Sequence, residues 1–263
     1  MGSLKKEMPP ELQEFAAIFE DMCHRHTDYG TLFCDFCDYW VGGMKLNGDL
    51  EVATRLNKKY GEDYKKFNLL VSTMILAYNK KIVDDNSWYD GLGTFYEVIA
   101  SRYKSSRLGQ FFTPHHICDL MTQLQNPVER DTVLDPCSGS GRLLLSAHAY
   151  NPKIMCYATD VDPVCAKMSA LNMAMHGVRG EVSCMNALSM EWHFGLIINP
   201  MFSTDGCPPI PHLQEIECFE YSIFYVNKEA LRERALAANG FADRKTVEAK
   251  IALEKSDGQL SLF

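Results

Sequence analysis

The first hundred or so residues carry apolar side chains at helical spacing. Leu12, Phe15, Ile18 and Phe19 fall on one face of a helix over residues 11–23. Large apolar or aromatic residues three and four positions apart predict further helices over residues 32–44, 68–78 and 93–103. We therefore expect a helical N-terminal domain over residues 1–108.

The pattern changes from residue 132 onward. Short apolar runs of strand length occupy residues 132–135, 153–159, 181–185 and 194–198. Helical patterns separate the first three runs, and the second of these helices has Pro163 at its start and Gly177 just past its end. Strands that alternate with helices predict an α/β fold with a parallel, doubly wound sheet, whose ligands bind beyond the carboxyl ends of the strands.

We place this α/β domain at residues 109–226 and expect a C-terminal helix with a flexible tail over residues 227–263. Residues 222–226 are the best candidate for a strand after the four named above. No apolar run reaches the length of a membrane span, and the charged N-terminus lacks the apolar stretch of a signal peptide. We expect a cytoplasmic protein whose ten scattered cysteines are buried thiols.

The net charge of −8 does not suit a general nucleic-acid coating protein, which is basic. Local basic patches still allow DNA contact, although solvated helix faces explain each patch as well. The candidates are Arg102, Lys104 and Arg107, and a second group at Arg232, Arg234, Arg244 and Lys245. A zinc site at Cys23, His24, His26, Cys34 and Cys37 is less favoured than buried helix cysteines, because aromatic residues interleave at helical period. We expect no metal.

Polar residues and glycines follow the first three predicted strands. Residues 135–141 (DPCSGSG) form a turn that opens a helix, where glycines permit close backbone approach and the helix N-terminus attracts a carboxylate. Asp160 ends the second strand, where a carboxylate can accept both hydroxyls of a ribose, and Asp162 is a second candidate. Asn186 follows the third strand and can bond the edge of an adenine. Each is explained singly as a turn residue or helix cap. Together they predict a nucleoside site.

Three motifs resemble those of γ-type adenine-N6 DNA methyltransferases, especially the modification subunits of type I restriction systems and their mobile-element relatives. They are GQFFTP at residues 109–114, DPCSGSG at residues 135–141 and NPMF at residues 199–202. The resemblance implies a Rossmann-like methyltransferase domain that binds S-adenosyl-L-methionine. It assigns cofactor contacts to Phe112, Thr113, Pro114, Asp135, Gly139, Ser140 and Gly141, to which the strand ends add Asp160, Asp162 and Asn186.

The tetrapeptide at residues 199–202 implies the catalytic groups. By this resemblance, the Asn199 side chain and the Pro200 carbonyl would accept the N6 hydrogens of an adenine flipped out of the duplex, and Phe202 would stack on its ring. Met201 departs from the family, which has proline there. Residues 203–263 leave no room for a large DNA-recognition domain, so we expect specificity to come from a specificity subunit, a homodimer or the N-terminal helices, or the chain to be a weakened relative.

Two other functions stay open on the sequence. The same tetrapeptide serves enzymes that methylate protein glutamine or RNA, although residues 109–114 favour the DNA group. A cofactor- and DNA-binding relative without activity is the other alternative. Residues 259–263 (QLSLF) also resemble the peptide that docks into the bacterial sliding clamp, with contacts from Gln259, Leu260, Leu262 and Phe263. A tail that folds back on the protein is the other interpretation of these residues.

Overall fold

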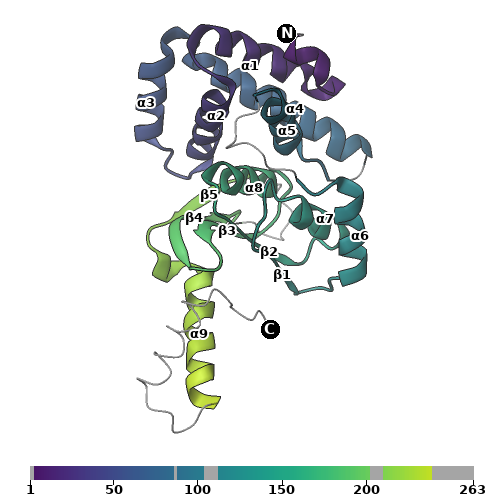
Figure 1. Cartoon of the computed structure of the whole chain (residues 1–263), viewed down its shortest axis with the longest axis vertical. Coiled ribbons are helices and arrows are strands. Elements are labelled where there is room, and N and C mark those ends of the chain that lie inside the picture. Colours follow the sequence, from purple (N-terminus) through teal and green to yellow (C-terminus); the bar gives the residue numbers. More distant parts are fainter. Residues whose placement is uncertain (1–2, 86–87, 104–111, 202–209, 239–263) are drawn as a thin grey trace.

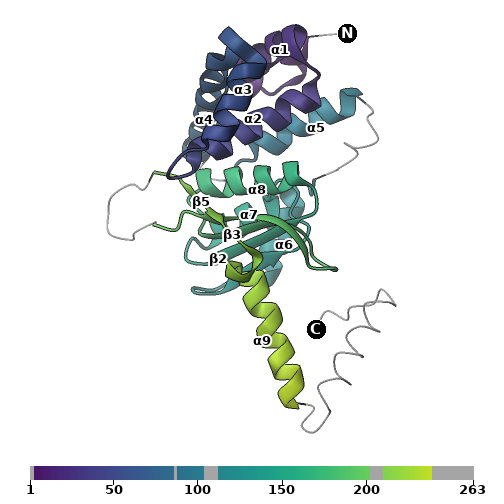
Figure 2. The same ribbon diagram turned by 90° about the vertical axis from the view of Figure 1, so that its left-hand side faces the viewer.

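The computed structural model describes residues 3–85, 88–103, 112–201 and 210–238. A layer of helices from the N-terminal part of the chain stands on one side of a β-sheet, as Figure 1 shows. Figure 2, turned by 90°, shows helix α8 (Pro163–Met175) between that layer and the sheet, and helix α9 (Ile223–Ala238) extending away on the opposite side.

The helical layer is built around aromatic residues. Its elements are 3-10 turns η1 (Leu4–Glu7), η2 (Pro10–Leu12) and η3 (Gly61–Lys65) and helices α1 (Gln13–His26), α2 (Tyr29–Met44), α3 (Leu50–Tyr60), α4 (Lys66–Asp85) and α5 (Gly91–Tyr103). The ring of Phe95 lies 4.7 Å from that of Phe15 and 4.8 Å from that of Phe19, both edge-on. Edge-to-face contacts stabilise such pairs beyond simple burial. The expected helical region is confirmed, although α3 was not predicted.

The sheet has five strands in chain order. They are β1 (Thr132–Asp135), β2 (Met155–Asp160), β3 (Gly180–Asn186), β4 (Glu191–Ile198) and β5 (Leu213–Ile216). Helices α6 (His115–Gln125) and α7 (Arg142–Tyr150) precede and follow β1, and α7 and α8 pack against β1–β3 and each other. The expected α/β class is confirmed, and β1, β2 and β3 run parallel as predicted.

The direction of β4 differs from the prediction. It runs antiparallel to β3, with Gly180 opposite Ile198, and β5 runs antiparallel to β4. Only residues 187–190 connect β3 to β4. A parallel crossover needs a dozen or more residues, so four residues can only close a hairpin. The sheet is therefore mixed, and β4 ends at the edge where β1–β3 begin.

Helix α8 is buried over nearly its whole length. Small or apolar side chains surround its axis, as expected for a helix covered on both sides. Two of its polar residues contact the helical layer: Asn172 accepts from the Tyr78 hydroxyl and Lys167 pairs with Asp38. These contacts fix the helical layer against the sheet.

The start of α9 replaces the strand predicted at residues 222–226. After a 3-10 turn, η4 (Phe219–Tyr221), the buried Glu181 carboxylate of β3 accepts hydrogen bonds from Ser222 Oγ and from the Ile223 amide at 3.0 Å. A carboxylate at a helix N-terminus satisfies free amide groups, so this segment is helical and the strand prediction was wrong.

Within the described ranges, no helix is long and apolar enough to cross a membrane.

Candidate functional site

The turn between β1 and α7 has a left-handed backbone at two glycines. Gly139 has φ 54° and Gly141 has φ 89°. The Ser138 amide donates to the Thr159 carbonyl at 3.0 Å, which ties the turn to the end of β2. A Cβ at position 139 would lie 2.7 Å from a ring atom of Phe112, so glycine is required for the ring to approach.

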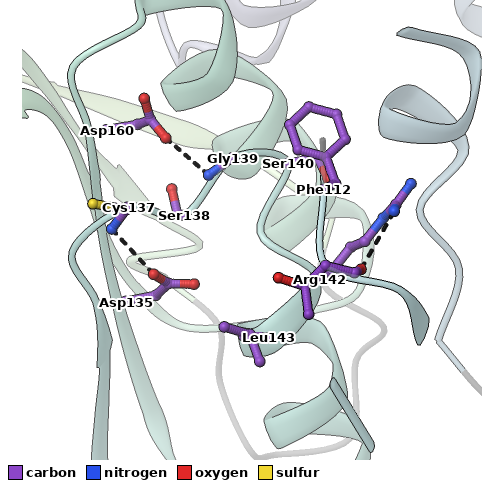
Figure 3. A pocket seen from close by; sticks show the side chains of 10 residues that line it. Phe112, Asp135, Cys137, Ser138, Gly139, Ser140, Arg142, Leu143 and Asp160 are labelled. Carbon is purple, nitrogen blue, oxygen red and sulfur yellow. Dashed lines mark hydrogen bonds between the residues drawn. The ribbon is translucent and has the colours of Figure 1, made fainter. Parts of the chain in front are cut away.

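This turn forms one wall of a cavity of about 240 Å³ at the carboxyl ends of β1 and β2, shown in Figure 3. Its lining combines carboxylates, hydroxyls, an aromatic ring and backbone of the turn: Phe112, Thr113, Asp135, Cys137, Ser138, Gly139, Ser140, Arg142, Leu143 and Asp160. Drug-sized ligands occupy pockets of roughly 300–1,000 Å³, so the cavity encloses part of such a ligand. Six of the ten residues that the sequence assigns to the cofactor are brought together here.

Asp160 is fixed by backbone donors. Its Oδ2 accepts from the Gly139 amide at 2.8 Å and its Oδ1 from the Asp162 amide at 2.9 Å. An ionised carboxylate has about four acceptor positions, so two remain for hydroxyl groups of a ligand. Burial raises the pKa of Asp160 and of Asp135. The charge of Asp160 adds to this effect on the pKa of Asp135, and the charge of Asp162 adds to it on the pKa of Asp160. Two partly desolvated carboxylates favour a ligand with hydroxyl donors and a positive charge.

Helix α7 begins at the same cavity without a side-chain cap, because Gly141 occupies the N-cap position. The free amides of a helix N-terminus attract anions and carboxylates. The cavity thus offers acceptors near Asp160 and donors near the start of α7. Such an arrangement suits an amino-acid-linked nucleoside, which carries ribose hydroxyls and a carboxylate.

Arg142, the first residue of α7, was not predicted. Its Nε donates to Asp90 at 2.6 Å and its Nη2 to Glu97 at 2.8 Å, and its guanidinium carbon lies 5.3 Å from the ring centre of Phe112. Glu97 also accepts from the Phe112 amide at 3.2 Å. These bonds hold the Phe112 segment over the cavity. No local sequence pattern indicates these bonds, because Glu97 and Asp90 lie 45 and 52 residues before Arg142 in the chain.

Four predicted cofactor residues do not line the cavity. Gly141 occupies the N-cap position of α7. Pro114 occupies the N-cap position of α6. Asp162 caps α8 by accepting from the Val164 amide at 2.8 Å, the helix-cap role that its position also allowed. The Asn186 side chain accepts from the amides at 188 and 189, which closes the β3–β4 hairpin. Their predicted ligand contacts stay predictions.

Asn199 lies at the other edge of the sheet. It is fully buried, its amide nitrogen donates to the carbonyls of Ala174 at 3.2 Å and Val178 at 2.8 Å, and its side-chain oxygen accepts from the His212 amide at 3.1 Å. Along β4, five residues separate it from Phe194, which is level with Asp160 across β3. At about 3.3 Å per residue, that is about 16 Å of strand. The structure therefore does not bring Asn199 and Pro200 to the cavity.

Some predicted features lie outside the described residues or side chains. These are Phe202, residues 109–111, most of both basic patches and residues 259–263. Within the described ranges, no three His, Cys, Asp or Glu side chains are placed to hold a metal ion. The described cysteines are free thiols, but Cys34 and Cys137 are exposed and Cys218 is half-buried, so the expectation of buried thiols is wrong for these three. The structure therefore does not test the predictions for the features that lie outside the described residues or side chains.

Comparison with known proteins connects this geometry to a family. Residues 87–205 match the N-6 DNA methylase family. The matched range holds the Phe112 segment, the glycine turn, Asp160 and the 199–202 tetrapeptide. The resemblance predicted from the motifs is thereby confirmed.

Similar curated proteins are methylase subunits of type I restriction enzymes. The chain is 30% identical over 95 residues to the type I restriction enzyme MjaVIII methylase subunit of Methanocaldococcus jannaschii, covering 34% of this chain and 16% of that one. It is 32% identical over 108 residues to the HindI methylase subunit of Haemophilus influenzae, covering 37% and 24%. The chain thus spans a quarter or less of the length of these relatives.

A solved structure is also similar. The type I restriction-modification methyltransferase subunit from Streptococcus thermophilus aligns over 67% of this chain and 56% of its own, with a TM-score of 0.33 and 17% identity.

Proposed function

We propose that this chain is an S-adenosyl-L-methionine-dependent methyltransferase that modifies the N6 amine of adenine in DNA. The observation that carries the proposal is the cavity of Asp160, the Gly139 turn and Phe112, within the residues that match N-6 DNA methylases. The similarity to methylase subunits of type I restriction enzymes supports DNA as the substrate.

The residues of the cavity fit the cofactor. Asp160 would accept the two ribose hydroxyls, and the turn with the start of α7 would hold the carboxylate of the methionine part. Phe112 and Thr113 would cover that part, because Arg142 and Glu97 hold them over the turn. The cofactor supplies a methyl group on a positively charged sulfur, which the carboxylates of Asp135 and Asp160 favour electrostatically.

The acceptor nitrogen needs its own partners. The lone pair of the adenine amine is conjugated with the ring, so two acceptors on its hydrogens must favour a pyramidal nitrogen. The Asn199 side chain and the Pro200 carbonyl are the proposed acceptors, after the base has left the duplex. The Asn199 amide is bonded to the carbonyls of Ala174 in α8 and of Val178 after it, so catalysis requires those bonds to open and β4 to approach the cavity.

The position of Asn199 also favours a second function. A fully buried asparagine that donates to a carbonyl in the last turn of α8, about 16 Å of strand from the cavity level, suits a structural role. The chain would then be a cofactor- and DNA-binding relative without methyl transfer. Methylation of protein glutamine or RNA is the third alternative left by the tetrapeptide.

Sequencing that detects N6-methyladenine tests the reaction. Cells without adenine methylation of their own would express the wild-type chain, Asn199→Ala or Asp160→Ala. The proposal predicts N6-methyladenine at a defined sequence with the wild type and none with either variant. The second function would be supported if the DNA of cells that express the wild type stays unmethylated while the purified wild-type chain binds the cofactor.

Partners follow from the relatives. DNA and a specificity subunit, or a second copy of the chain, are proposed because the type I methylase subunits that this chain resembles belong to multi-subunit restriction enzymes. We also propose a cytoplasmic location, where DNA and reduced thiols are found.

Docking to a sliding clamp through Gln259, Leu260, Leu262 and Phe263 remains a further proposal. The intact chain should retain purified clamp in a pull-down, and a chain truncated after Gly258 should not. Equal retention by both chains, or by neither, would eliminate it.

A further inference from the structure

A buried carboxylate joins the helical layer to the cofactor turn. Asp90 directly precedes α5 and has no solvent exposure. Its Oδ1 accepts from the Gly93 amide at 2.7 Å and from Asn172 Nδ2 at 2.8 Å. Its Oδ2 accepts from Ser140 Oγ at 2.6 Å and from Arg142 Nε at 2.6 Å.

These four donors belong to three parts of the molecule. Gly93 is in the first turn of α5, Asn172 is in α8, and Ser140 and Arg142 flank the last glycine of the cofactor turn. A buried carboxylate is strongly disfavoured unless charge and hydrogen bonds compensate it. Asp90 has both, so its burial requires the three segments to keep this arrangement.

The neighbouring groups extend the same connection. Asn172 Nδ2 also donates to the Ser140 carbonyl at 2.7 Å, and the Leu92 amide donates to the Tyr78 hydroxyl, which is bonded to Asn172. Close packing at Gly93 completes it, because a Cβ there would lie 2.0 Å from the Asp90 carboxylate and 2.6 Å from Ser140 Oγ. The turn is therefore positioned from the helical layer as well as from the sheet.

We propose that Asp90 is a positioning residue for cofactor binding, so that the helical layer is part of the cofactor site. Asp90 does not line the cavity. It acts through Ser140 and Arg142, which do, and through Arg142 on the Phe112 segment. The identity of the ligand rests on the proposed function, whereas the effect of Asp90 on the turn does not.

The test compares Asp90→Asn with Asp35→Asn. Asparagine keeps the size but cannot accept two charge-assisted bonds in the same way. Asp35 is a matched control: it is also a buried carboxylate of the helical layer, bonded to Arg55 at 2.7 Å, Lys59 at 2.6 Å and Tyr60 at 2.7 Å. None of its partners lines the cavity. Both variants therefore lose a similar network, and only one network contacts the turn.

Two quantities are measured on each full-length chain. Calorimetric titration gives the Kd for S-adenosylhomocysteine, and hydrogen exchange gives the protection of a peptide covering residues 137–143. We expect the two variants to lower the Tm by similar amounts. Asp90→Asn should raise the Kd tenfold or more, which is about 1.4 kcal/mol, and should speed exchange in that peptide. Asp35→Asn should change the Kd less than twofold and leave that exchange unchanged.

Equal effects of the two variants on Kd and on exchange would overturn the proposal. If Asp90→Asn does not fold, Ser140→Ala removes the hydroxyl bond to Asp90 alone, and unchanged exchange over residues 137–143 in that variant would also overturn it. If the wild type binds no S-adenosylhomocysteine, the proposed function fails, and the exchange comparison still decides the role of Asp90.

Discussion

Replacing Gly139 by alanine should damage both stability and the cofactor site, for two separable reasons. The left-handed backbone at φ 54° costs an L-residue about 1–2 kcal/mol. The added Cβ would also lie 2.7 Å from Cδ1 and 3.0 Å from Cε1 of Phe112, and forcing such a contact costs about 1–3 kcal/mol. We expect a total loss of about 2–5 kcal/mol, with displacement of Phe112 from the cavity.

Gly48 provides a matched control. Its φ of 65° is similar, but nothing lies within 4 Å of a Cβ built there. Gly48→Ala should therefore lose only the backbone part, about 1–2 kcal/mol, and should bind S-adenosylhomocysteine normally. Urea unfolding gives the two stabilities and calorimetry gives the two affinities. The reasoning is refuted if Gly139→Ala loses no more stability than Gly48→Ala and binds with unchanged affinity.

Three further predictions concern the opposite edge of the sheet and α8. Asn199→Ala should lose about 3 kcal/mol in urea unfolding, because three buried hydrogen bonds of about 1 kcal/mol each disappear; a loss below about 1 kcal/mol would contradict the observed contacts. Met201→Pro should lose about 1 kcal/mol and Met201→Ala nothing, because the Met201 amide donates to His212 Nε2 at 3.2 Å and only proline removes it. Burial lowers the pKa of His176 to about 4, and its Nε2 accepts from the Tyr89 amide, so the folded state favours the neutral ring. The pKa of histidine in the unfolded chain is about 6.5. The neutral His176 ring therefore contributes fully to the free energy of unfolding above pH 6.5, and this contribution falls by up to about 3 kcal/mol as the pH falls toward 4. His176→Gln should flatten the unfolding free energy over that pH range relative to the wild type; equal slopes would contradict the assignment.

Much of the cofactor site could be predicted because its signals are local. The glycine turn after a short apolar strand and Asp160 at the next strand end are neighbours in space whenever two strands are parallel and adjacent. The hydrophobic pattern likewise predicts the helices whose apolar face meets the core, such as α1 and α2. These features depend on spacing within a few residues, which a single sequence displays.

The remainder depended on contacts between distant residues. Asp90 resembles an ordinary helix cap in the sequence, and its bond to Arg142 arises only when α5 is placed beside α7. The direction of β4 followed from the length of the 187–190 connection, which the apolar pattern of the strand does not report. The direction of β4 also determines the position of Asn199. Because we predicted a parallel β4, we expected Asn199 at the same end of the sheet as the cofactor residues, whereas the antiparallel strand places it at the opposite end.

Cofactor binding through Asp160 is the central claim, and one calorimetric titration tests it most directly. S-adenosylhomocysteine is titrated into the wild type, Asp160→Ala and Asp28→Ala, whose lost carboxylate caps α2 and does not line the cavity. Removing two hydrogen bonds to a charged acceptor, each about 1.5–3 kcal/mol, should weaken binding about a hundredfold or more in Asp160→Ala. Asp28→Ala should bind like the wild type. No binding by the wild type, or unchanged affinity in a folded Asp160→Ala, would contradict the claim.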